Sequence, residues 1–125
     1  MWIKYNPNPE GKQVGDCAIR AIAKALGTDW ATAYTTLALA GYTMADLPNA
    51  VPVYGAILRK NGFTRKAIPN TCPDCYTIND FCRDHPEGRF VIVTGNHVVA
   101  AIDGRIYDTW DSGGEVPILY FEEEN

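Results

Sequence analysis

Cys17, His97 and Asp108 are the residues of this sequence whose types suit nucleophilic chemistry. A cysteine sulfur attacks as the thiolate, a histidine can take up and return a proton, and a carboxylate can orient the histidine ring. These residues lie far apart along the chain, so they can act together only where the fold brings them into contact. The elements that carry them therefore decide whether such a site can form.

Cys17 begins a predicted helix that ends at Leu26. Asp16 is a typical N-cap residue, because its carboxylate can accept free backbone N–H groups, and Gly27 suits the left-handed helix end. One broad face is expected to be apolar and buried, with Ala18, Ile19, Ile22, Ala23 and Leu26. The positive end of the helix dipole favours a thiolate at Cys17. A buried structural thiol is the alternative interpretation.

His97 and Asp108 lie on two predicted strands that a tight turn joins. Asp103 and Gly104 suit a two-residue hairpin loop, in which both residues need positive φ. Counting outward from this loop places His97 and Asp108 on one face of the sheet as diagonal neighbours, within side-chain reach. Asp111 falls on the opposite face, and a slip of one residue would exchange the two carboxylates.

The remaining elements predict an α+β fold in which N-terminal helices pack on a C-terminal antiparallel sheet. Further helices are expected at residues 30–40 (ended by Gly41), at 52–60, and from a capping box at 77–80 to a point before Pro86. Strands are expected at residues 63–68, 89–94, 97–102, 105–110 and 116–121. We expect residues 1–125 to form a single domain, with an irregular lead-in at 1–15 and an exposed acidic tail at 122–125.

Three segments resemble the papain-like cysteine peptidases. Asp16-Cys17 at a helix start resembles their nucleophile helix, and residues 96–102 resemble their histidine strand. Asp108-Thr109-Trp110 resembles their orienting residue and tryptophan, with Asp as in the C39-type relatives. The chain also looks like small bacterial and phage proteins with Gly-Asp-Cys near the start and Tyr-Asp-Thr-Trp-Asp near the end. The match covers about residues 13–112, and the order and register of the motifs are more specific than any one of them.

The resemblance implies a minimal papain-like hydrolase, a thiol protease or amidase. Cys17 would attack a peptide or isopeptide carbonyl, His97 would carry the proton, Asp108 would hold the ring, and an acyl-enzyme would form and hydrolyse. Papain-like enzymes also use a glutamine side chain to bind the oxyanion. Gln13 is the only glutamine here, although it lies two residues closer to the cysteine than in papain. Asn96 or backbone N–H groups are the alternative donors.

A second motif, C-x2-C-x6-C-x2-H, consists of Cys72, Cys75, Cys82 and His85. These ligand types suit a structural zinc, and four protein ligands would leave no open position for catalysis. Alternatively, Cys72 and Cys75 are a loop pair, Cys82 is a core residue and His85 caps the short helix. The catalytic interpretation needs no metal and no cofactor. The competing function is a catalytically silent papain-like or zinc-braced module that binds a protein.

Composition and charge narrow the expected partners. The formal net charge is −4 and the basic residues are scattered, which disfavours a nucleic-acid partner. No apolar run approaches the roughly 20 residues that span a membrane, and the N-terminus lacks the features of a signal peptide. We therefore expect a cytoplasmic protein, with cysteines that are free, catalytic or metal-bound rather than paired in disulfides. The expected partner is a peptide or protein substrate.

Overall fold

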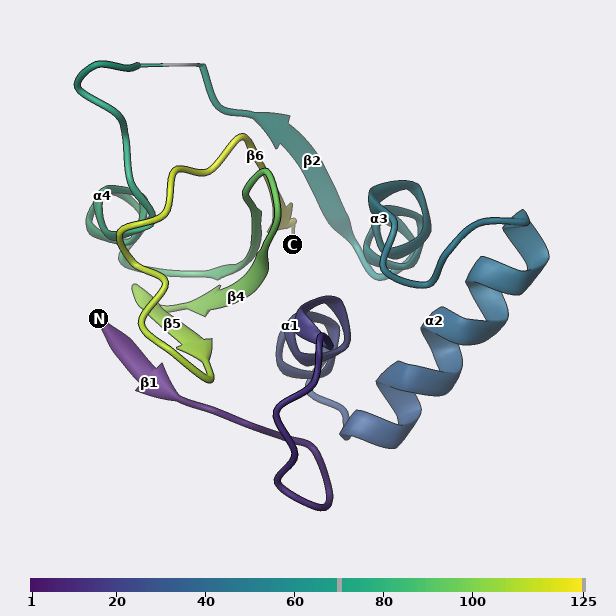
Figure 1. The fold of residues 1–125 in the computed structure, drawn as a ribbon. Helices are drawn as coiled ribbons and strands as arrows, with labels where there is room; N and C mark the ends of the chain where they lie inside the picture. The colour runs from purple at the N-terminus through teal and green to yellow at the C-terminus, as the bar shows by residue number, and fades with distance from the viewer. Residues whose placement is uncertain (70, 125) are drawn as a thin grey trace.

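The computed structural model describes residues 1–69 and 71–124, and it confirms the predicted α+β class (Figure 1). The helices of this part of the chain are α1 (Cys17–Leu26), α2 (Trp30–Met44), α3 (Val51–Lys60) and α4 (Ile78–Asp84). Its strands are β1 (Trp2–Lys4), β2 (Phe63–Ala67), β3 (Arg89–Val93), β4 (Val98–Ile102), β5 (Arg105–Asp108) and β6 (Leu119–Glu123).

The strands form one mixed sheet in the order β1-β5-β4-β3-β6-β2. All neighbours are antiparallel except β1 and β5, which run parallel. The predicted antiparallel pairing of the C-terminal strands is therefore confirmed, whereas the parallel strand β1, which makes the sheet mixed, was not predicted. Part of the lead-in forms β1, because the free edge of β5 accepts it: Tyr5 N–H donates to Asp108 O at 2.8 Å, and Ile106 N–H donates to Met1 O at 2.8 Å.

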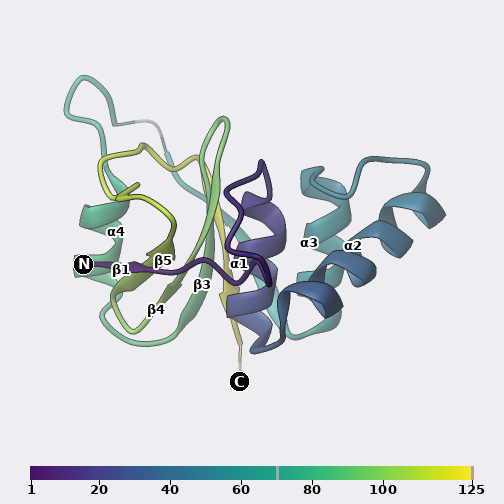
Figure 2. The same ribbon diagram turned by 60° about the horizontal axis from the view of Figure 1, so that its bottom comes forward.

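Helices cover both faces of the sheet (Figure 2). α1 packs on β4 and β3, and α3 packs on β2 of the same face. α2 lies outside α1 and α3, and α4 lies on the other side of the sheet. β3 is buried on both faces, because successive side chains of a strand point in opposite directions. Val91 and Val93 belong to the cluster under α1, whereas Phe90 and Ile92 belong to the cluster under α4.

α1 forms at its predicted bounds and lies against the middle of the sheet. Its buried face is made largely of small residues, Ala18, Ala21, Ala23 and Ala25. Gly27 ends it with φ of 67° in the left-handed region, as predicted. The Asp16 side chain, however, makes no capping hydrogen bond, so that part of the prediction is wrong.

α2 extends four residues beyond its predicted end. Gly41 lies inside the helix rather than after it, and the left-handed residue that follows the helix is Ala45, with φ of 54°. A Cβ at position 41 would lie 2.9 Å from Asp46 O and 3.0 Å from Pro48 N. This glycine therefore allows the returning chain to approach the helix closely instead of ending the helix.

β6 replaces most of the predicted acidic tail. The strand begins at Leu119 and continues through Glu122 and Glu123, because β3 and β2 offer hydrogen-bonding partners on its two sides. Both glutamates are half-buried, and Asn125 lies outside the described residues. Within residues 1–69 and 71–124, no helix combines the length and apolar character that crossing a membrane would need.

Candidate active site

The β4–β5 hairpin brings His97 and Asp108 together. Its strand register is the predicted one, and Asp103 and Gly104 adopt the positive φ values, 51° and 78°, that the two-residue loop requires. His97 directly precedes β4 and Asp108 is the last residue of β5. His97 Nε2 lies 2.6 Å from Asp108 Oδ2, and the two side chains are 9% and 1% exposed.

Cys17 reaches this pair because α1 packs on β4. The sulfur lies near enough to the His97 ring and to the backbone N–H of Val98 for both groups to lower the pKa of the thiol. Since Nε2 of His97 contacts Asp108, the other ring nitrogen, Nδ1, is left for the sulfur. Cys17 itself is half-buried. The three residues of the predicted triad therefore lie together.

The pKa values of Cys17 and His97 shift in opposite directions. Burial raises the pKa of the Cys17 thiol, but the interactions with His97 and Val98 and the charges of His97 and Arg20 outweigh burial and lower it. Burial lowers the pKa of His97, but the contacts with Asp108 and Cys17 outweigh it and raise the pKa to about 9. These shifts favour a thiolate and an imidazolium side by side.

Asp108 is held by donors on both carboxylate oxygens. Arg20 Nη2 donates to Oδ1 at 3.0 Å and Thr109 N–H donates to it at 2.8 Å. Ser112 Oγ donates to Oδ2 at 2.7 Å, beside His97. Burial raises the pKa of Asp108, but the contacts with His97, Ser112 and Thr109 outweigh it and lower the pKa. The carboxylate is therefore ionised and fixed in orientation at neutral pH.

Arg20 and Asp16 are site residues that sequence reasoning missed. Arg20 Nη1 donates to Asp16 Oδ1, and Trp30 Nε1 donates to Asp16 Oδ2 at 2.9 Å. Because these two donors hold the carboxylate, it does not cap α1. Arg20 and Asp16 are only 6% and 4% exposed. An arginine within an otherwise apolar, alanine-rich helix face, four residues after an aspartate, is the signal that could have identified them.

Trp110 lies over the His97 ring, with 5.1 Å between the ring centroids, and is 44% exposed.

The other residues that the sequence suggested for the site are exposed at the protein surface. Asp111 is exposed and accepts the Gly113 N–H at 3.1 Å, so Asp108 is the carboxylate that contacts the histidine. Gln13 and Asn96 are both exposed, and the oxyanion role of either remains a prediction.

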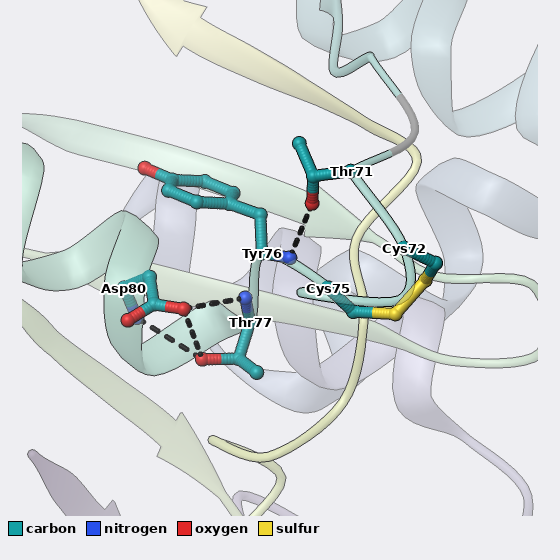
Figure 3. Close-up of a disulfide and its surroundings, with 6 residues drawn as sticks. All are labelled: Thr71, Cys72, Cys75, Tyr76, Thr77 and Asp80. Atoms are coloured by element: carbon teal, nitrogen blue, oxygen red, sulfur yellow. Dashed lines mark hydrogen bonds between the residues drawn. A yellow bond between two sulfur atoms is a disulfide. The ribbon is translucent and has the colours of Figure 1, made fainter.

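The zinc motif does not assemble. Cys72 and Cys75 form a disulfide in the loop before α4 (Figure 3), which also shows that the expectation of no disulfides is wrong. Cys82 is buried, and His85 stacks on Phe81 with 4.0 Å between ring centroids. Among the described residues, no group of three or more His, Cys, Asp or Glu side chains could hold a metal ion. The disulfide uses two of the four proposed ligands.

The structure gathers a thiol, an imidazole and a carboxylate in one place, and acyl transfer by a cysteine nucleophile uses groups of these three types. Compared with known proteins, the chain matches no family model, no curated protein and no solved structure. The functional interpretation therefore depends on the site itself and on the motifs described above.

Proposed function

We propose that this protein is a papain-like cysteine hydrolase that cleaves a peptide or isopeptide bond through Cys17, His97 and Asp108. The observation that carries the proposal is a histidine ring that lies 2.6 Å from a buried carboxylate through Nε2 and that lowers the pKa of the Cys17 thiol. A structural cysteine would need neither partner. Papain-like character rests on the order of the motifs along the chain, from the nucleophile helix to the histidine and orienter strands.

The proposed reaction begins with attack of the Cys17 thiolate on the carbonyl carbon, which moves the C=O π electrons onto oxygen. As the tetrahedral intermediate collapses, the imidazolium of His97 gives its proton to the leaving amine while the C–N bond breaks. Water then attacks the thioester as His97 takes its proton. Collapse of this second intermediate breaks the C–S bond, releases the acid and restores the Cys17 thiolate beside the protonated His97 ring. Asp108 keeps the ring oriented and stabilises its positive charge throughout.

Backbone N–H groups at the start of α1 are the best-supported oxyanion donors. The first N–H groups of a helix have no intrahelical partner. The Asp16 side chain does not satisfy them here, because it binds Arg20 and Trp30. The N–H of Cys17 is thus available beside the sulfur, and the Gln13 amide could add a second donor if its segment closes on the substrate.

A cavity between α1 and α2 is a candidate place for a substrate side chain, next to the proposed catalytic residues in sequence but not lined by them. It has a volume of about 230 Å³ and is mostly apolar, with Ala18 and Ile19 of α1 on one side and Tyr34 and Pro48 on the other. Asp16 and Ala18, the neighbours of Cys17 in sequence, both line it. We therefore expect peptides that carry an apolar side chain near the cleaved bond to be better substrates than polar ones.

Alkylation by iodoacetamide tests the nucleophile, because Cys82 is an internal control. Burial raises the pKa of Cys82, whereas that of Cys17 is lowered. An ordinary thiol is about 3% thiolate at pH 7, so a largely ionised Cys17 gains up to about thirtyfold in rate from ionisation alone. We expect mass spectrometry to show rapid labelling of Cys17. The rate should fall by up to about thirtyfold in His97→Ala and stay unchanged in His85→Ala, which changes the only other histidine.

Hydrolysis is tested with a panel of fluorogenic peptides and isopeptides. Cys17→Ser should abolish turnover, while Cys82→Ser should leave it intact. Labelling of Cys17 as slow as that of Cys82, or labelling that does not depend on His97, would contradict the proposal. That result would favour the alternative, a catalytically silent module of papain-like fold that binds a protein.

A further inference from the structure

Arg20 connects the two halves of the candidate site. It lies one helical turn after Cys17 on α1, and its guanidinium is buried between two carboxylates. Nη1 contacts Asp16, the residue before the nucleophile, and Nη2 contacts Asp108, the residue that holds His97, at 3.0 Å. One side chain therefore contacts both Asp16, which precedes Cys17 in the sequence, and Asp108, which binds His97.

We propose that Arg20 is a positioning residue of this site, which fixes the Asp108 carboxylate relative to the nucleophile helix. The inference rests on the proposed function, since it assigns Arg20 a part in the same chemistry. Its role is indirect, because Asp108 and Asp16 stand between it and the reacting atoms.

The division of contacts on Asp108 supports this role. Arg20 and Thr109 N–H occupy Oδ1, which leaves Oδ2 for His97 and Ser112. Loss of the arginine would leave Oδ1 with the single backbone donor of Thr109 and would hold the carboxylate less firmly. The planar guanidinium can bridge two carboxylates from different elements, whereas a lysine ammonium is a single point charge.

The charge balance gives Arg20 a second effect. With the thiolate and imidazolium formed, the site holds three negative groups, Asp16, Asp108 and Cys17, against the positive charges of Arg20 and His97. Removing Arg20 leaves a single positive charge among three negative ones in a buried setting. Its charge also contributes to the lowered pKa of Cys17. We therefore expect the thiolate to become less favourable in its absence.

Arg89 provides the matched control, because it also ties α1 to the sheet. Its Nη1 donates to the carbonyl oxygens of Lys24 and Ala25, at 3.3 and 3.2 Å, at the end of α1 opposite to Cys17. A role of Arg20 limited to holding the helix in place would be shared by Arg89. A role in orienting Asp108 and supplying positive charge to the site would not be shared by Arg89.

The test is the rate of iodoacetamide alkylation of Cys17 against pH in the full chain, for wild type, Arg20→Met, Arg20→Lys and Arg89→Met. We expect Arg20→Met to slow alkylation at pH 7 about tenfold and to move the midpoint of the pH profile upward. Arg20→Lys should fall between Arg20→Met and wild type, since it keeps the charge but not the bridge. Arg89→Met should keep the wild-type profile.

Each outcome separates this inference from the proposed function. Wild-type Cys17 that reacts no faster than Cys82 would overturn both. Selective wild-type labelling with identical profiles for Arg20→Met and Arg89→Met would overturn only the role of Arg20. If Arg20→Met does not fold, Arg20→Lys is compared with Arg89→Lys. We expect about threefold slower alkylation at pH 7 in Arg20→Lys, and equal rates would overturn the inference.

Discussion

Asp108→Asn should change the stability of this protein in a way that depends on pH. The substitution keeps the size of a side chain that is 1% exposed but removes its charge. Burial lowers the pKa of His97, and the contacts with Asp108 and Cys17 raise it from 6.5 to about 9. In the variant, the ring loses the carboxylate at 2.6 Å and with it a large part of this rise.

The size of the stability change follows from the shift in the pKa of His97. Each pKa unit corresponds to about 1.4 kcal/mol, so a rise from 6.5 to about 9 corresponds to about 3–4 kcal/mol. Cys17 supplies part of the rise, and solvent at the open side of the site screens another part, so about 1–3 kcal/mol belongs to Asp108. Because the folded-state pKa is the higher one, this stabilisation is complete below pH 6.5 and disappears as the pH rises through 9.

Urea unfolding of both proteins at pH 6 and pH 10, followed by tryptophan fluorescence, measures the difference. The variant should be less stable than wild type at both pH values, and the gap should be larger at pH 6 by about 1–3 kcal/mol. The Arg20–Asp108 ion pair contributes at both pH values and cancels from this comparison. Asp111→Asn is the control, and an equal gap at the two pH values for Asp108→Asn would refute the reasoning.

Two further predictions concern the scaffold. Gly41→Ala should destabilise the fold by about 1–3 kcal/mol in urea unfolding, because its Cβ would meet backbone atoms at 2.9–3.2 Å. Gly114→Ala, which meets nothing within 4 Å, should change stability by less than about 0.5 kcal/mol, and equal effects would contradict this packing argument. The double variant Cys72→Ala and Cys75→Ala, which lacks the disulfide, should have a free energy of unfolding lower by about 1–2 kcal/mol. The effect is modest because the disulfide closes a very short loop. Dithiothreitol should lower the Tm of wild type and leave that of the double variant unchanged.

Sequence patterns were most informative where neighbouring residues decide the structure. The capping box at Thr77 and Asp80 forms as predicted, and Gly27 ends α1. Sequence patterns were least informative where a segment distant in the sequence determines the local structure. β1 forms because the edge of β5 accepts it, and Gly41 stays helical because a later segment packs against it. The spacing of Cys72 and Cys75 fits a zinc motif as well as a disulfide, and only the folded loop shows that they form the disulfide.

The sequence by itself determined that a cysteine begins α1 and that His97 and Asp108 share one face of a hairpin. Both follow from local geometry, the 3.6-residue helical period, the two-residue strand period and a turn that needs positive φ. Only the tertiary structure decided that α1 packs on β4, so that Cys17 meets His97. It also decided that Asp16 binds Arg20 instead of capping its helix, because a buried guanidinium needs carboxylate partners, and Asp108 supplies the second one from a distant strand.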